Sequence, residues 1–216
     1  MRLYHFMRAE HGLLALGARR LKISRLDRQN DPFELFADAQ EDRGRRGQVR
    51  AERAAIASQW GMVCFCRDWH DPVLWGHYAE RHQGLCLGFE VDETRAVPVT
   101  YISNRIGPLR LQDAIVPGKS ADGPPSLAAM KFANWRYENE VRLWARLDEA
   151  GPDLQFTPFG PDMKLRSVHL GPRCDVTRAQ IMKALGELAR DVEIVTTRLA
   201  FRTFRVVTQR DPSLWR

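Results

Sequence analysis

The chain has 216 residues, of which 44% are hydrophobic and 28% are charged, a composition that is typical of a globular protein and excludes general disorder. A chain of this length buries enough apolar surface to fold without disulfides or a structural metal, so we expect one domain over residues 1–216. The formal net charge of +6 favours anionic partners, which include nucleic acids, acidic proteins and phosphorylated cofactors.

No targeting or membrane segment is expected. The amino terminus becomes charged before any hydrophobic run develops, and no stretch approaches about 18 uninterrupted apolar residues. The four cysteines lack CxxC spacing, so we expect reduced core thiols rather than a redox or zinc site. These features predict a cytoplasmic protein without a membrane partner. They leave its oligomeric state open.

The predicted elements mix strands and helices without the strict alternation of a parallel fold. Alternation with a period of two indicates a strand, and a period near 3.6 indicates a helix. In chain order we expect strand 3–8, helix 9–17, strand 21–25, helix 45–59, strand 62–66, helix 71–82, strands 85–91 and 97–101, helix 126–135, strands 141–145 and 166–170, helix 176–190, and strands 193–197 and 202–207. This mixture predicts an α+β fold with a mainly antiparallel split sheet and flanking helices.

One long segment, residues 103–125, lacks this periodicity. Its many glycines and prolines are typical of an ordered loop or a mobile flap. We find no strong domain boundary in it.

Two polar positions stand out in the first third of the chain. His5 shares a strand face with apolar neighbours, so it is either a core histidine or a ligand-binding group. The sequence Asn30-Asp31-Pro32-Phe33-Glu34 predicts a turn that enters a helix, with Asp31 as a good cap. Its side chains could also serve a site, so both interpretations stay open for His5 and for this turn.

The predicted helix 71–82 carries an unusual set of aromatic side chains. Trp75, Tyr78 and His82 fall at i, i+3 and i+7 and therefore line one stripe. His77 lies about 100° away on the next face. Such a stripe is usually core, but these side chains need polar partners when they are buried, so a binding role is an equal alternative.

A third polar segment follows the glycine-rich loop. Lys131 and Trp135 are neighbours at i, i+4 in the predicted helix. In the next strand Glu140, Arg142 and Trp144 share the face opposite the apolar residues, so we expect that face to look onto solvent or a cleft. Glu140 is therefore a site candidate, with a structural ion pair as the alternative.

Several common site classes are not indicated. The chain has no glycine-rich phosphate loop, no HExxH helix and no GxSxG nucleophile turn. The histidines are scattered rather than spaced as metal ligands, so we predict no bound metal.

Taken together, the segments resemble the uncharacterised bacterial family called domain of unknown function 2971. The motifs that carry the resemblance are Tyr4-His5, Asn30 to Glu34, Cys64-Phe65, Trp75 to Ala79, His82 to Phe89 and Trp135 to Arg142. The resemblance covers about residues 3–145, and residues 151–216 match it weakly.

The layout of these motifs more distantly resembles the ADP-ribosyltransferase superfamily. This resemblance implies an ADP-ribosyltransferase-like fold and NAD as the cofactor, with His5 on a ribose, Tyr78 on the nicotinamide ring and Glu140 on the ribose 2′-hydroxyl. Glu138 competes with Glu140 for the key role. Further cofactor contacts are expected at Ser24, Trp75, His77, Lys131 and Arg142.

The expected function is NAD-dependent ADP-ribosyl transfer to a nucleic acid or a protein, or NAD glycohydrolysis, as in a toxin or a phage-defence effector. One alternative is a metal-dependent module that binds or cleaves nucleic acid, with its metal held by Asp31, Glu34, Glu138 and Glu140. The other alternative is a non-catalytic binding domain in which these residues only stabilise the fold.

Overall fold

A computed structural model describes residues 1–34, 42–107, 126–148 and 150–215. The chain forms two compact units, each built from separated segments. The first unit comprises Met1–Leu21, Phe65–Arg95 and Thr157–Arg216, and the second comprises Lys22–Cys64 and Ala96–Phe156. Both units mix helices with antiparallel-rich sheet, which confirms the predicted α+β class. The expectation of a single domain stays a prediction.

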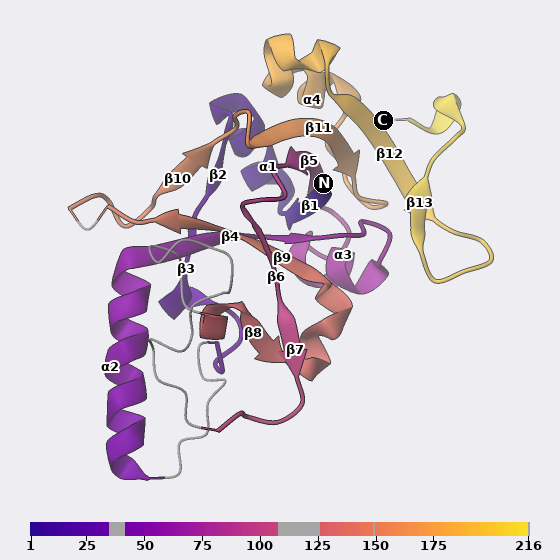
Figure 1. Cartoon of the computed structure of the whole chain (residues 1–216). Helices are drawn as coiled ribbons and strands as arrows, with labels where there is room; N and C mark the ends of the chain where they lie inside the picture. Colours follow the sequence, from indigo (N-terminus) through magenta and orange to yellow (C-terminus); the bar gives the residue numbers. More distant parts are fainter. Residues whose placement is uncertain (35–41, 108–125, 149, 216) are drawn as a thin grey trace. The chain divides into compact units, whose positions relative to one another are not determined.

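The first unit is built on a sheet with the strand order β13-β12-β11-β5-β1 (Figure 1). Its strands are β1 (Arg2–Met7), β5 (Leu85–Val91), β11 (Met163–Leu170), β12 (Glu193–Leu199) and β13 (Val206–Thr208). Neighbouring strands pair antiparallel except β11 and β12, which are parallel. Tyr4 lies opposite Gly88 in the β1–β5 register.

Helices and short 3₁₀ turns complete the first unit. They are α1 (Ala9–Ala18), α3 (Pro72–Tyr78), α4 (Arg178–Leu185), η5 (Gly186–Arg190) and η6 (Pro212–Leu214). The Asp71 carboxylate caps α3 by accepting from the Val73 amide at 2.8 Å, and Pro72 fits the first turn. One core cluster of this unit comprises Trp69, Trp75, Ala79, Cys86 and Val206, with Tyr4 and Phe6 packed against it.

The second unit holds β3 (Ser24–Arg25), β4 (Trp60–Cys66), β6 (Ala96–Pro98) and β9 (Glu140–Arg146), in which β3 pairs with β4, and β9 lies between β4 and β6. The last two residues of β4 belong to the first unit, where Cys66 pairs with Tyr4. A separate parallel pair joins β7 (Thr100–Ile102) to β8 (Met130–Phe132). The short strands β2 (Arg20–Lys22) and β10 (Phe156–Pro158) also pair, and each has two of its three residues in the first unit.

The helical elements of the second unit are α2 (Arg43–Gln59), η1 (Leu26–Arg28), η3 (Ser126–Ala129) and η4 (Ala133–Glu138). Although α2 is mostly polar, it buries Val49, Ile56 and Ala57, and the last two join a core cluster that includes Met62 and Trp144. The amphipathic pattern of α2 therefore fixes which of its faces meets the sheet.

Most predicted strands and helices are present, but several boundaries are wrong. The strands expected at 21–25 and 97–101 are each divided into two, β2 with β3 and β6 with β7, and the helix expected at 176–190 is α-helical only as far as Leu185. The predicted helix 126–135 is wrong, because these residues form the 3₁₀ turn η3, strand β8 and the start of the 3₁₀ turn η4. Pairing of β8 with β7 outweighs local helix propensity. Helix α3 ends at Tyr78, since Glu80, Arg81 and His82 all have positive φ, so His82 does not continue its stripe. Of the expected strand 202–207, only residues 206 and 207 belong to a strand, β13, which ends at Thr208.

Some expectations fall wholly or partly outside the described residues. The helix expected after Glu34 and most of the loop expected at 103–125 are among them. All four cysteines are free thiols; Cys66, Cys86 and Cys174 are buried, whereas Cys64 is only partly buried. Across the ranges given above, no helix is both long and apolar enough to cross a membrane.

Candidate functional site

Arg142 lies at the centre of a buried network of ion pairs in the second unit. Its side chain is 0% exposed, and Nη1 donates to Glu34 Oε1 at 2.6 Å while Nε donates to Glu140 Oε1 at 2.8 Å. Nη2 reaches the second oxygen of each carboxylate at 3.1 Å. The guanidinium thus binds two carboxylates at once, which its planar fork suits.

Lys131 extends the network to a third carboxylate. Its ammonium lies 2.5 Å from Glu138 Oε2 and 3.2 Å from Glu140 Oε2, and it also stands 4.7 Å from the centre of the Trp135 ring. Burial acts to lower the pKa of Lys131, but Glu140 and Glu138 outweigh it, so the pKa is raised. Lys131 is therefore a cation throughout the physiological range.

The carboxylates differ in their proton affinity. Burial acts to raise the pKa of Glu140, but Arg142 and Lys131 outweigh burial and bring it to about 2. For Glu34 burial is the stronger effect, so its pKa is raised although Arg142 opposes this. The network holds three carboxylates and two cations, and the negative charge of Glu140 adds to the rise at Glu34. Glu140 is therefore fixed as an anion at neutral pH.

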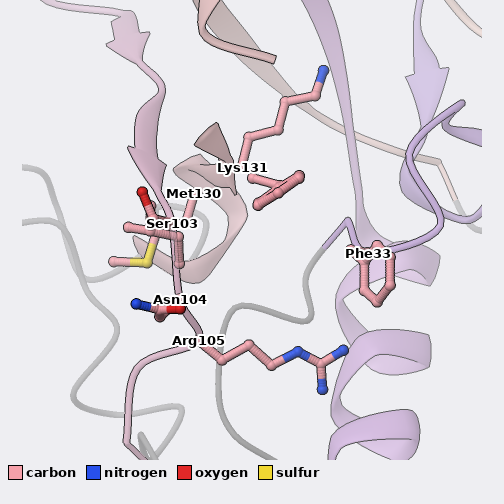
Figure 2. Close-up of a pocket in the computed structure, with 8 residues that line it drawn as sticks. Phe33, Ser103, Asn104, Arg105, Met130 and Lys131 are labelled. Atoms are coloured by element: carbon pink, nitrogen blue, oxygen red, sulfur yellow. The ribbon is translucent and has the colours of Figure 1, made fainter. Parts of the chain in front are cut away.

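A cavity of about 300 Å³ opens beside this network (Figure 2). Arg105 stands over the Phe33 ring, with its guanidinium carbon 5.3 Å from the ring centre. Lys131 also lines the cavity, but its ammonium is bonded to Glu138 and Glu140, so its apolar stem is what it contributes to the wall. The complete lining is Phe33, Ile102, Ser103, Asn104, Arg105, Met130, Lys131 and Phe132.

The turn at Asp31 connects the cavity to the network. Asp31 is buried, and its Oδ1 accepts from the Phe33 amide at 2.9 Å, as predicted for a turn residue. Phe33 then faces the cavity and Glu34 binds Arg142. The second oxygen, Oδ2, is buried and has no hydrogen-bond partner within the described ranges.

The prediction for the face of β9 was wrong. Glu140, Arg142 and Trp144 are only 6%, 0% and 9% exposed, so that face is buried rather than open to solvent or a cleft. Trp144 belongs to the core cluster, while Glu140 and Arg142 form an ion pair with each other. Strands that are covered on both faces are usually recognised by a continuous apolar run. The charged residues of β9 interrupt such a run, so the alternating pattern indicates a strand with one exposed face.

The other predicted site residues lie elsewhere. His5, on β1, is half-buried with its ring 5.6 Å from Phe65, and Tyr78 closes α3 with its ring 6.0 Å from exposed His77. Trp75 is fully buried and donates from Nε1 to the Trp69 carbonyl at 2.6 Å, so it supports the first unit. These belong to the first unit, whereas Ser24, paired with Met62, belongs to the second.

The structure therefore brings together Lys131, Glu140 and Arg142, with Glu138 beside them. Sequence reasoning missed the Glu34–Arg142 pair and the Arg105–Phe33 wall of the cavity. The only local signal for these contacts was the turn at Asp31. A turn there directs Phe33 and Glu34 to different sides, Phe33 to the cavity and Glu34 to Arg142.

The described residues do not support the acidic metal site. Among them, no group of three or more histidine, cysteine, aspartate or glutamate side chains is arranged to hold a metal ion. Glu34, Glu138 and Glu140 bind Arg142 and Lys131 instead.

Comparison of the chain with models of known protein families found no match, and comparisons with curated proteins and with solved structures found none either.

Proposed function

We propose that the cavity of the second unit binds one end of NAD, and that the protein uses NAD for ADP-ribosyl transfer to a macromolecule or for NAD glycohydrolysis. The observation that carries this proposal is that Lys131 contacts both the cavity and the ion-pair network. It lines the cavity with its stem and holds the ionised Glu140 with its ammonium. The α+β fold with its antiparallel-rich sheet is compatible with an ADP-ribosyltransferase-like architecture.

The chemistry of the wall supports a ring-bearing anionic ligand. Phe33 and Phe132 are both exposed at the cavity and offer apolar surface to a nicotinamide or adenine ring. Arg105 supplies a guanidinium for a phosphate, and Ser103 and Asn104 supply hydrogen-bonding groups. A volume of about 300 Å³ is at the small end for ligand sites, which suits one end of a dinucleotide.

The network supports the bond-breaking step. Cleavage of the bond between nicotinamide and ribose develops positive charge on the sugar, and a fixed anion stabilises that charge as it grows. Glu140 is such an anion. Its Oε2 accepts from both Lys131 and Arg142, so a shift of Lys131 towards a bound phosphate frees one of these two positions for the sugar while Arg142 stays bonded. Glu138, bonded to the same ammonium, is the second candidate for this role.

One observation favours a second candidate function, a non-catalytic binding domain. Both oxygens of Glu140 are bonded to cations, Oε1 to Arg142 and Oε2 to Arg142 and Lys131. A carboxylate satisfied in this way stabilises a fold without taking part in a reaction. In that case the cavity binds its ligand and releases it unchanged.

The test is to incubate the purified protein with NAD and follow free nicotinamide, with NAD binding measured separately by calorimetry. Turnover that is lost in Glu140→Gln or Glu138→Gln while NAD still binds supports ADP-ribosyl chemistry and identifies the carboxylate. Binding without turnover supports the binding domain. Glu90→Gln, which changes an exposed carboxylate of the first unit, is the matched control and should behave as wild type.

Each variant also needs a thermal unfolding curve, because a folded but inactive variant and an unfolded one give the same loss of turnover. If wild-type protein neither binds NAD nor releases nicotinamide, both forms of the NAD proposal are wrong.

A further inference from the structure

The loop that joins β12 to β13 exposes two phenylalanine rings to solvent. Phe201 is 90% exposed and Phe204 is 97% exposed, more than any other large hydrophobic residue among those described. Figure 1 shows this loop extending beyond the paired parts of the two strands. Two almost fully exposed aromatic rings so close in sequence are unusual and indicate a binding surface.

The loop has a fixed base. Leu199 lies opposite Val206 in the β12–β13 pairing, and the Ala200 amide donates to the Arg205 carbonyl at 2.9 Å. Val206 is fully buried in the core of the first unit, and its amide donates to the His70 carbonyl at 2.9 Å. The two rings are therefore presented by a hairpin that is anchored in the core, not by a frayed end.

The loop is also strongly basic. Residues 198–205 read Arg-Leu-Ala-Phe-Arg-Thr-Phe-Arg, with three arginines and no acidic residue. The guanidinium carbon of Arg198 stands 4.4 Å from the centre of the Phe201 ring, while Arg205 donates to Asp68 at 2.8 Å. Arg202 is exposed between the two rings. Aromatic rings and cations thus alternate along the loop.

A hollow lies beside the rings. It has a volume of about 480 Å³ and is lined by Pro72, His82 and residues 199–205. Nδ1 of His82 is buried and has no hydrogen-bond partner within the described part of the chain.

We propose that the β12–β13 hairpin is a contact site for single-stranded nucleic acid. Bases stack on exposed aromatic rings whatever their sequence, and arginines beside the rings pair with the phosphates that link the bases. Phe201 and Phe204 supply the rings, and Arg198 and Arg202 supply the charge. The overall charge of +6 draws the same anionic partner to the protein.

A lipid surface fits the hairpin less well. Insertion of both rings into a bilayer would carry Arg202 and Thr203, which lie between them, into the apolar region. A duplex also fits less well, because its bases are already stacked on one another. A single strand leaves bases free for both rings and phosphates free for Arg202.

The test measures binding of fluorescently labelled oligo-dT and oligo-U to the full chain by anisotropy, without NAD. The double variant Phe201→Ala/Phe204→Ala should bind both strands about 5- to 150-fold more weakly, because at least one stacked base is lost. The conservative Phe201→Tyr/Phe204→Tyr should retain binding, since the rings remain. Arg202→Ala should reduce the salt dependence of binding, by about 0.7 in the slope of log affinity against log salt.

Two surface substitutions in the same unit are matched controls. Leu14→Ala removes another exposed large apolar side chain, and Lys183→Ala removes another exposed cation, and neither should change binding. All the positions changed are exposed or nearly so, so unfolding temperatures should stay close to wild type. Stronger binding of oligo-dT or of oligo-U shows whether DNA or RNA is the natural ligand.

Three outcomes overturn the proposal: no binding of either strand by wild type at low salt, equal binding by the Phe201→Ala/Phe204→Ala variant, or binding only to vesicles that contain anionic lipid. None of these outcomes bears on NAD turnover, so this inference and the NAD proposal fail independently.

Discussion

Arg142 binds Glu34 across 108 positions of sequence, with Nη1 to Oε1 at 2.6 Å and Nη2 to Oε2 at 3.1 Å. Both side chains are almost completely buried, and Arg142 also holds Glu140. The pair therefore connects the turn after Asp31 to strand β9 in the second unit. Because buried charges are stable only when they are paired, this contact has measurable consequences.

Arg142→Met should lower the free energy of unfolding by about 3–5 kcal/mol, since it leaves Glu34 and Glu140 buried without their main partner. The measurement is chemical denaturation at neutral pH. Arg166→Met removes the partner of Glu90 in an exposed ion pair, so it should change stability far less. Equal effects of the two substitutions would show that the network is not a stability determinant.

Stability should depend on pH through Glu140. Its pKa in the folded protein is about 2, below the ordinary value of 4.5, because Arg142 and Lys131 outweigh burial. A lowered pKa adds stability that is complete above about 4.5 and is lost as the pH falls towards about 2. The difference in unfolding free energy between wild type and Glu140→Gln should therefore shrink by roughly 3 kcal/mol over this window. A difference that stays constant with pH would contradict the ionised state of Glu140.

His169 should stay neutral in the folded first unit. Burial, with smaller effects from His70 and Arg2, lowers its pKa from 6.5 to about 3, and its Nε2 lies 3.0 Å from the Ser167 hydroxyl. The unfolded chain takes up a proton below 6.5 and the folded chain does not, so stability present above 6.5 is lost as the pH falls towards 3.

The measurement is the NMR titration of the His169 ring, which should show no transition between about pH 7 and about pH 5. In denaturation experiments over the same range, His169→Gln should lose stability less steeply than wild type. A ring that titrates near 6.5 would show that the side chain is accessible to water.

Gly84 cannot carry a side chain without distortion. A Cβ atom there would lie 2.1 Å from the Met7 carbonyl oxygen and 2.9 Å from the Ala79 backbone. Gly84→Ala should lower the free energy of unfolding by about 1–3 kcal/mol. Gly76→Ala, in α3 with nothing within 4 Å of the new atom, should instead raise it by about 0.5–1 kcal/mol. Thermal or chemical unfolding distinguishes the two directions.

The cavity of the second unit should lose affinity when Arg105 is shortened. Arg105→Ala removes the guanidinium that stands over Phe33, so NAD should bind about 10- to 100-fold more weakly if a phosphate occupies that position. Arg105 is exposed, and stability should be unaffected. Calorimetry measures the affinity, and Arg146→Ala, a cation that stands over Trp60 instead, is the matched control. Unchanged affinity in Arg105→Ala would place the ligand elsewhere.

Local pattern was sufficient for the parts of the fold whose signals are local. The alternation of apolar and polar residues located β5 and most of β1, and Asp71-Pro72 located the start of α3, because caps and strand periodicity act over a few residues. The Asp31 turn was recognised for the same reason.

The candidate site depended on contacts between distant segments. Residues 130–132 form a strand because β7 is available to pair with them. Helix propensity is a local property and does not predict pairing with a distant strand. Glu140 and Arg142 are buried because Glu34 and Lys131 reach them from separate elements, and a charge pattern alone indicates an exposed face. Burial of an ion pair requires all its partners in place, so only tertiary structure distinguishes a closed network from an open cleft.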